Sequence, residues 1–399
     1  MEPTQQTRPS RRRILQAGGL GAATLAASAA SAGPALAATV GGPADGVDRD
    51  SLRFRADGTF TVVQFNDTQD SHTTDVRTTE LQHAVLDDVT PDFALINGDV
   101  INGGPRTVEQ VKQALNNVVL PMEERRIPWA LTMGNHDEDT AGRTGMTEEK
   151  ILDFVRQYRY NVNDAQARGI TGHGNEVLTV RSSQGGRAGF ALWLLDSGRY
   201  APDQLAGQDF AGYPDWDWLR FDQVDWYWRT SQQLERQHGG LVPGLVFQHI
   251  CLWEHRFMWW ASVDSRTEDD HARAVAKHGI VGERHEDECP GPFNSGMFNA
   301  MLHRGDVKGL FVGHDHINTY VGNYYGIDLG YAPGTGFGTY GLGGADNHRL
   351  RGARVFRLDE NVEGVYAGTE LRFAKDYGID VGFAGYRPGT PAALPEYVS

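Results

Sequence analysis

The stretch Thr59-Phe60-Thr61-Val62-Val63-Gln64-Phe65-Asn66-Asp67 decides the fold class of this chain. Its apolar and β-branched residues stop at two polar ones, which is typical of a buried β-strand. Apolar residues then recur at helical spacing from Leu81 to Val89, Pro91 follows them, and Phe93–Ile96 is the next apolar run. A strand, a helix and a second strand in this order predict a parallel or mixed sheet with helices packed on it.

The same alternation continues along the chain. Helices are expected near Val108–Val119 and Val224–Gln237. Further strands are expected at Trp129–Met133, Phe190–Leu195, Leu245–His249, Leu310–Gly313 and Ala353–Leu358. Polar residues stand at the C-terminal end of each strand, and open α/β sheets bind their ligands along that edge. The sequence therefore predicts a functional site at the C-terminal ends of the strands.

The polar residues at these strand ends are of the types that bind transition metals. They are Asp67, Gln69, Asp99, Asn135, His136, His249, His314 and His316. Carboxylates and imidazoles on neighbouring strand ends can converge on one point, and this mixture suits divalent ions. A shared carboxylate such as Asp99 can bridge two ions about 3.5–4 Å apart, the arrangement used in phosphoester hydrolysis. One Asp or His in such a place is more often a hydrogen-bonded turn residue, so the ordered set carries the prediction.

The order of these motifs resembles that of the calcineurin-like metallophosphoesterases, in particular their purple-acid-phosphatase-like branch. The motifs stand here as Asp67-Thr68-Gln69, Gly98-Asp99, Gly134-Asn135-His136-Asp137, His249 and Gly313-His314-Asp315-His316. The resemblance implies an α/β fold, a four-layer sandwich of two mixed β-sheets flanked by helices. It also implies a dimetal site at the C-terminal ends of the strands.

The resemblance further implies a role for each residue and a cofactor of two divalent metal ions, Mn, Fe or Zn. The first ion would be held by Asp67, Asp99 and His316 with Gln69, and the second by Asp99, Asn135, His249 and His314. His136 would protonate the leaving oxygen or steady the phosphoryl group. Asp137 would orient the His136 imidazole, as carboxylates often do. A metal-bound hydroxide would attack the phosphorus, its pKa lowered toward neutrality by the ions.

Two positions depart from the family pattern. Gln69 stands where the family has His, and an amide oxygen is a weaker ligand than imidazole. The first ion is therefore expected to be bound more loosely, to be a harder ion such as Mn²⁺, or to be partly absent. Asn102 stands where purple acid phosphatases have the Tyr that colours their iron site. A purple iron chromophore is not expected.

Residues 1–37 have the layout of a signal peptide. The run Ser10-Arg11-Arg12-Arg13-Ile14-Leu15-Gln16 resembles a twin-arginine export signal, and a region rich in Ala and Gly follows it to Ala37. A membrane anchor is the alternative, but this region is only weakly hydrophobic and Pro34 interrupts it. We expect export by the Tat machinery and cleavage before Ala38. The mature protein would then be secreted, extracellular or periplasmic, without a membrane anchor.

The rest of the chain is expected to form one catalytic domain. We expect residues 38–57 to form a linker and residues 376–399 to form a C-terminal tail. Between them, residues 58–375 are expected to form the metallophosphoesterase domain, with a Trp-rich insertion at about 200–295. The tryptophans of the insertion form either a packed sub-core, the commoner use of aromatic residues, or an aromatic wall beside the metals. Cys251 and Cys289 can pair after export or stay free. The glycine-rich run 334–341 lacks the Gly-Lys-Ser/Thr of a P-loop and predicts a structural loop.

The charge of the chain limits the kinds of molecule that it is expected to bind. The 399 residues include 37 Lys and Arg against 52 Asp and Glu, a formal charge of −15. So acidic a chain is not expected to hold nucleic acid by non-specific phosphate contacts. We expect a secreted, dimetal-dependent phosphohydrolase that cleaves phosphate mono- or diesters of small molecules. Two alternatives stay open: a catalytically idle metal-binding protein of the same fold, marked by Gln69, and an extracellular carbohydrate- or wall-binding module built on the Trp-rich segment.

Overall fold

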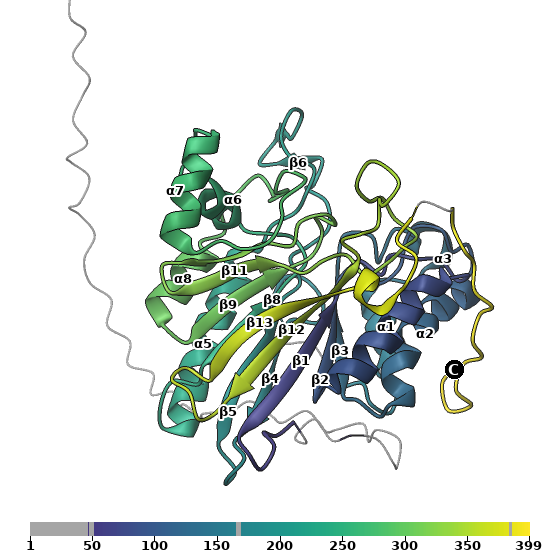
Figure 1. Ribbon diagram of the computed structural model, residues 1–399, viewed down its shortest axis with the longest axis horizontal. Coiled ribbons are helices and arrows are strands. Elements are labelled where there is room, and N and C mark those ends of the chain that lie inside the picture. Colours follow the sequence, from purple (N-terminus) through teal and green to yellow (C-terminus); the bar gives the residue numbers. More distant parts are fainter. Residues whose placement is uncertain (1–46, 48–51, 165–168, 383–384) are drawn as a thin grey trace, which may run out of the picture. The chain divides into compact units, whose positions relative to one another are not determined.

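Two mixed β-sheets pack face to face at the centre of the fold (Figure 1). One sheet has five strands in the order β13-β12-β1-β2-β3, and the other has six in the order β10-β11-β9-β8-β5-β4. The computed structural model describes residues 47, 52–164, 169–382 and 385–399. The predicted signal peptide and most of the predicted linker therefore lie outside the described residues.

The five-stranded sheet contains the strand from which the fold was predicted. Its members are β1 (Thr59–Phe65), β2 (Phe93–Asn97), β3 (Trp129–Thr132), β12 (Gly352–Asp359) and β13 (Tyr366–Phe373). β1, β2 and β3 run parallel, whereas β12 is antiparallel to both β1 and β13. The helices on this side are α1 (Val76–Val89), α2 (Val108–Glu124), α3 (Ala141–Thr144) and α4 (Glu148–Val155). Leu81, Val85 and Val89 recur every four residues on α1, and this spacing buries them against the sheet.

The six-stranded sheet carries the second half of the chain. Its members are β4 (Glu176–Arg181), β5 (Ala188–Leu194), β8 (Gly244–Phe247), β9 (Val307–Val312), β10 (Val321–Tyr324) and β11 (Ile327–Tyr331). β5, β8, β9 and β11 run parallel to one another. The helices on this side are α5 (Phe221–His238), α6 (Trp253–Trp260), α7 (Glu268–His278) and α8 (Met297–Arg304). The remaining elements are the small pair β6 (Gln204–Leu205) and β7 (Gln208–Asp209) and the 3₁₀ helix η2 (Ala374–Tyr377).

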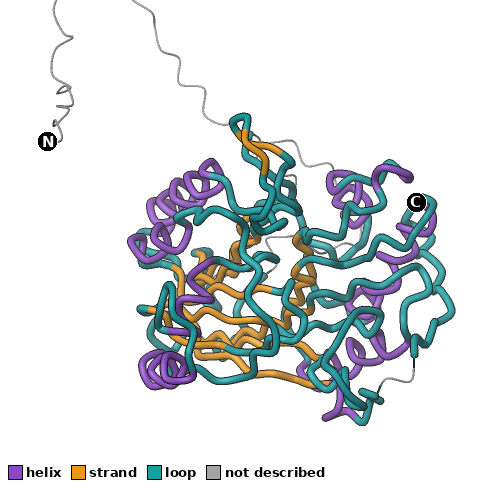
Figure 2. The backbone as a smooth tube through the Cα atoms, turned by 90° about the horizontal axis from the view of Figure 1, so that it is seen from above, coloured by secondary structure: helices purple, strands orange, loops and turns teal. Residues whose placement is uncertain are grey.

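Three buried clusters separate the layers. One fills the space between the two sheets, where the Phe311 ring of β9 lies 4.6 Å from the Phe356 ring of β12, centroid to centroid. The other two lie between each sheet and its own helices. Seen from above, helices flank the strands on both sides (Figure 2). The prediction of a four-layer sandwich with two mixed sheets is confirmed. Among the helices that the structure describes, none is long and apolar enough to span a membrane.

The two ends of the described chain are packed rather than loose. Leu52 and Phe54, inside the predicted linker, are only 2 % exposed and belong to the cluster between the sheets. At the other end, Tyr397 of the predicted tail donates a hydrogen bond to Glu123 of α2, and Val398 is buried. Neither segment has a periodic apolar pattern, so composition alone makes both resemble linkers.

The Trp-rich segment serves mainly as packing. Trp259 is buried in the core behind the six-stranded sheet, and Trp226, Trp228 and Trp260 pack against that core. Trp216 differs, because its ring lies 4.5 Å from the ring of His314, centroid to centroid. The packing interpretation is therefore confirmed for these four residues, whereas Trp216 lies beside a predicted ligand.

Candidate metal centre

All of the predicted ligands lie at the C-terminal ends of five strands from both sheets. Asp67 and Gln69 follow β1, Asp99 follows β2, Asn135 follows β3, His249 follows β8, and His314 and His316 follow β9. Each of the seven side chains is at most 7 % exposed. The Asn97 side-chain amide donates to the carbonyl oxygens of Gln248 at 2.8 Å and Phe311 at 3.3 Å. These bonds tie the strand ends of the two sheets together.

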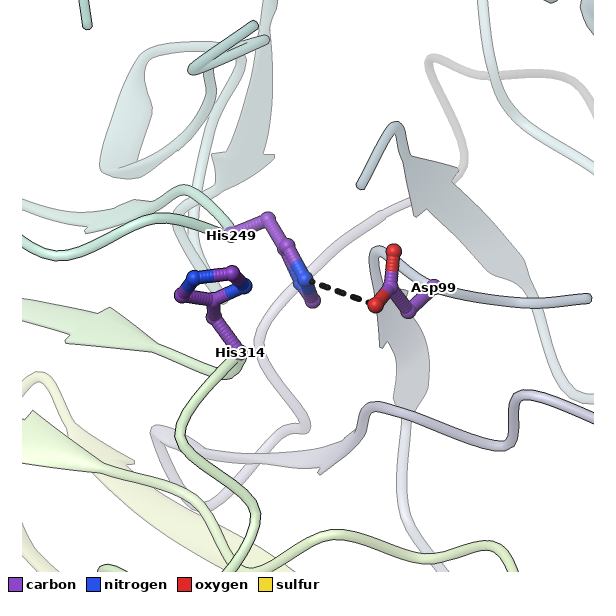
Figure 3. Close-up of side chains that lie close together, drawn as sticks. All are labelled: Asp99, His249 and His314. Carbon is purple, nitrogen blue, oxygen red and sulfur yellow. Dashed lines mark ion pairs between the residues drawn. The ribbon is translucent and has the colours of Figure 1, made fainter. Parts of the chain in front are cut away.

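The acidic and imidazole groups form two overlapping sets. Asp67, Asp99 and His316 form one set, and Asp99, His249 and His314 form the other. Within each set the possible ligand atoms lie within 4.8 Å of one another, and Asp99 belongs to both. Figure 3 shows the second set, in which His249 Nε2 lies 3.3 Å from Asp99 Oδ2. This arrangement suits two ions that share one carboxylate.

Two of the histidines are oriented by bonds to their outer nitrogens. His249 Nδ1 lies 2.9 Å from the Asn97 carbonyl oxygen and donates to it. His316 Nδ1 bonds Thr339 Oγ1 at 2.9 Å, so Nε2 of each ring is left to face the carboxylates. Outer bonds of this kind fix the tautomer of metal-binding histidines. Burial opposes the charged form of His249, but the charges of Asp99 and Asp67 outweigh it and raise its pKa to about 10.

Asn135 provides an independent sign that the site is built for an ion. Both polar atoms of its side chain are buried, and neither has a hydrogen-bond partner among the described residues. A buried amide without partners costs about 1–3 kcal/mol. A divalent cation beside the amide oxygen would offset that cost. Oxygen and imidazole ligands together fit Mn, Fe or Zn.

The backbone at the site adopts sparsely populated conformations. Asp67, Gln69, Asp99 and His314 have φ values of 48°, 33°, 48° and 71°. Non-glycine residues rarely enter this left-handed region, and such conformations cluster at functional sites. The surrounding structure must therefore hold these four residues in place.

Glycines next to the ligands make room for the other strand ends. A Cβ on Gly98 would lie 2.4 Å from His249 Nδ1, and one on Gly134 would lie 2.2 Å from the Asp99 backbone nitrogen. No side chain fits at either position. The Gly-Asp and Gly-Asn-His motifs therefore combine a ligand with the space that lets another ligand approach it.

Gln69 reaches the site, but with its nitrogen toward a carboxylate. Its Nε2 donates to Asp99 Oδ2 at 3.2 Å. The amide oxygen can face an ion only if the amide group turns over, because the nitrogen cannot be a ligand. The role of Gln69 as a metal ligand stays a prediction.

His136 lies at the open side of the site. Its side chain is 34 % exposed, and its Nδ1 lies 2.6 Å from Asp139 Oδ2. Burial opposes the charged imidazole, but the bond to Asp139 and the charge of Asp99 outweigh it and raise the pKa of His136. His136 is thus the site residue best placed to touch a substrate.

Asp139, not Asp137, orients the His136 ring, which corrects the role predicted for Asp137. The Asp137 carboxylate is fully buried and accepts three backbone N–H bonds, from Val100, Ile101 and Gly134. It therefore joins the loops that follow β2 and β3. The sequence has three successive acidic residues at 137–139, and only the turn geometry shows which of them meets the imidazole.

The glycine-rich loop packs against a predicted ligand, and the two cysteines are unpaired. The predicted structural loop 334–341 carries Thr339, which bonds His316, and Tyr340, whose ring stacks on His316 at 4.3 Å. The loop therefore supports a predicted ligand. Cys251 and Cys289 are both free thiols in the structure.

Replacing the buried Glu148 by glutamine is expected to stabilise the protein at alkaline pH. Glu148 is 6 % exposed, and burial together with repulsion from Asp196 raises its pKa to about 9 from an ordinary 4.5. Its stabilising protonated form is fully present below pH 4.5 and is lost as the pH rises through about 9. Urea unfolding at pH 8 should show Glu148→Gln about 2 kcal/mol more stable than the wild type, with a smaller gain at pH 5.

The exposed neighbour Glu149 provides the matched control, and Glu149→Gln should change stability at neither pH. A gain for Glu148→Gln that is equal at pH 5 and pH 8 would contradict the assigned pKa.

Comparison with known proteins finds a phosphoesterase family and relatives whose names include the word phosphatase. The family described as calcineurin-like phosphoesterase matches residues 60–318. "Probable inactive purple acid phosphatase 14" of Arabidopsis thaliana is 31% identical over 73% of this chain and 74% of its own length. "Probable inactive purple acid phosphatase 29" of the same plant is 29% identical over 78% of this chain and 80% of its own length. "Phosphatase DCR2" of Saccharomyces cerevisiae is 26% identical over 62% of this chain and 39% of its own length.

Proposed function

Because this chain belongs to the calcineurin-like phosphoesterase family, we propose that it hydrolyses phosphate mono- or diesters of small molecules with two divalent metal ions. The observation that carries the proposal is the pair of three-residue sets that share Asp99. Two ions that share one carboxylate are the usual machinery of phosphoester hydrolysis. The ions would be held by Asp67, Asp99 and His316 on one side and by Asp99, Asn135, His249 and His314 on the other.

In this proposal most of the site residues would hold the ions, whereas His136 would transfer a proton. Bound ions would lower the pKa of a water molecule and neutralise the phosphoryl oxygens. His136 lies at the exposed side of the set, and Asp139 holds its Nδ1 at 2.6 Å. The proton that His136 gives to the leaving oxygen would therefore come from Nε2. Asp139 stabilises the charged imidazole until that transfer.

A second candidate function is a metal-binding protein without turnover. Two observations favour it: Gln69 turns its amide nitrogen toward Asp99, and two plant relatives carry the word inactive in their names. Against it stands the half-buried, charge-paired His136, since an idle site has no need of a proton donor. We therefore rank hydrolysis first.

Metal content and ester hydrolysis, measured on the same preparation, test the proposal. The protein is analysed by mass spectrometry for Mn, Fe and Zn, and then assayed with 4-nitrophenyl phosphate and bis(4-nitrophenyl) phosphate. Close to two ions per chain with hydrolysis that a chelator abolishes would support the enzyme. Bound metal without turnover of either ester, even after Mn²⁺, Zn²⁺ or Fe²⁺ is added, would favour the idle protein.

Gln69→His is expected to tighten the first metal site about tenfold, since imidazole is the stronger ligand. The measurement is competition with a chelator of known affinity. The control is Gln184→His, which adds an imidazole at an exposed position far along the chain. Unchanged affinity in Gln69→His would mean that position 69 does not face the ion.

We also propose that the protein is exported by the twin-arginine route, on the basis of residues 10–16. Arg11→Lys combined with Arg12→Lys should leave the precursor inside the cell. Arg8→Lys, outside the motif, serves as the control. Export that survives the double substitution would exclude this route.

A further inference from the structure

Two aromatic side chains, Tyr200 and Trp216, lie beside the predicted proton donor and a predicted ligand of the second ion. The Tyr200 hydroxyl is 3.3 Å from His136 Nδ1, and the two rings meet edge to face at 6.3 Å. The Trp216 ring lies 5.9 Å from the Tyr200 ring and 4.5 Å from His314. The pair therefore spans the distance between the predicted proton donor and a predicted ligand of the second ion.

The backbone fixes this pair in place. Residues 200 and 216 form an antiparallel bridge. Hydrogen bonds close it on both sides, from the Ala201 nitrogen to the Asp215 carbonyl at 2.7 Å and from the Asp217 nitrogen to the Arg199 carbonyl at 3.2 Å. The rings thus stand at the base of a hairpin whose tip carries β6 and β7. A rigid aromatic surface binds a ligand with little loss of conformational freedom.

The pair is also open to a ligand. Tyr200 is 39 % exposed and Trp216 is half-buried. A leaving group that takes its proton from His136 Nε2 would lie within reach of the residues that surround that imidazole. Tyr200 is such a residue. The phosphoryl group itself would lie deeper, over the buried carboxylates.

The two arginines at the site, Arg199 and Arg351, are already bonded and do not offer a charge to the leaving group. Arg199 is already engaged by Asp139 at 2.7 Å, by Glu138 at 3.4 Å and by the Asn135 carbonyl oxygen at 3.0 Å. Arg351 is 1 % exposed and donates to the carbonyl oxygens of residues 339 and 340. Neither guanidinium is available for a second phosphate. Tyr200 and Trp216 therefore offer the leaving group an aromatic contact rather than a charged one.

We infer that Tyr200 and Trp216 bind the leaving group of the substrate, and that this group has an aryl or similarly flat apolar face. The inference rests on the proposed phosphoesterase function, of which it names the substrate class. An aromatic contact of this kind strengthens binding by about fivefold beyond the area that it buries. The contact should favour larger aryl groups over smaller ones.

The test compares 2-naphthyl phosphate with phenyl phosphate in four proteins. Phenol and naphthol have similar acidity, so the ratio of their kcat/KM values reports contact with the ring rather than ease of departure. Tyr200→Leu removes the ring, whereas Tyr200→Phe keeps the ring and removes only the hydroxyl. Tyr213→Leu is the control, since Tyr213 is 64 % exposed in the same hairpin and packs on Phe210.

We expect the naphthyl-to-phenyl ratio to fall about fivefold in Tyr200→Leu and to stay at the wild-type value in Tyr200→Phe and Tyr213→Leu. A ratio in Tyr200→Leu within twofold of the wild type would overturn the inference while leaving the phosphoesterase intact.

Binding of 2-naphthyl phosphonate, which is not hydrolysed, separates this inference from the proposed function. If the metal-loaded protein cleaves neither ester, the proposed function fails, and titration calorimetry with the phosphonate still tests the aromatic pair. The Kd should then be about fivefold weaker in Tyr200→Leu than in Tyr200→Phe. Equal Kd values, or no binding by any of the four proteins, would overturn the inference.

Discussion

Replacing Asp99 by alanine is expected to remove both metal ions and to lower phosphoester hydrolysis by about a thousandfold. Asp99 is the one residue common to both three-residue sets, and it is 1 % exposed. Without its carboxylate, each set loses an anionic ligand, and His249 loses the partner 3.3 Å from its Nε2. Metal stoichiometry and kcat/KM, measured on the same sample, check the result.

The surface carboxylate of Asp153 provides the control for the Asp99 substitution. Its side chain is 66 % exposed and pairs with Arg156 on the surface, so Asp153→Ala should keep both ions and full activity. Two ions still bound by Asp99→Ala would show that Asp99 does not bridge them. The proposal of a shared carboxylate would then be wrong.

Replacing His136 by alanine is expected to lower hydrolysis by about a hundredfold to a thousandfold while both ions stay bound. His136 belongs to neither three-residue set, and its half-buried ring lies beside them. The loss should be larger for phenyl phosphate than for 4-nitrophenyl phosphate, because nitrophenolate departs without help from an acid. The comparison of the two esters therefore separates a proton donor from a structural residue.

Asp139→Asn gives a graded version of the same experiment. It keeps the imidazole and removes the charged group 2.6 Å from Nδ1, so activity should fall by about tenfold.

For His136→Ala, an equal loss of activity with both esters would mean that His136 steadies the phosphoryl group instead of protonating the leaving oxygen.

The central strands and the site motifs could be predicted because their signals are local. Thr59–Phe65 is a strand with the predicted bounds, and the strands before Asp99, Asn135 and His314 end within a residue of the predicted positions. A buried strand is mostly apolar, as in β1, and a metal site draws on a few residue types. Both features are visible in the sequence.

The missed elements depend on contacts between distant residues. β13 is only partly buried along its length, so it lacks an apolar pattern. The pairing of Tyr200 with Trp216 needs the hairpin between them to close, and nothing in either residue's neighbours predicts it. The choice of Asp139 over Asp137 follows from which carboxylate the backbone amides of the turn have already taken. These features depend on contacts that exist only once the chain has folded, so the sequence pattern does not show them.

Because β1 lies between β2 and β12, the five-stranded sheet cannot be completed before β12 has been synthesised. Gln64 pairs with Arg354, so the first strand to leave the ribosome waits for one of the last. At about 5–20 residues per second, the synthesis of the intervening chain takes roughly 15–60 s. One edge of β1 is unpaired for that whole time. Asp67 likewise meets His316 only near the end of translation. The two proposed ion sites would therefore form late and together, and a nascent fragment that stops before β9 would have neither set of ligands.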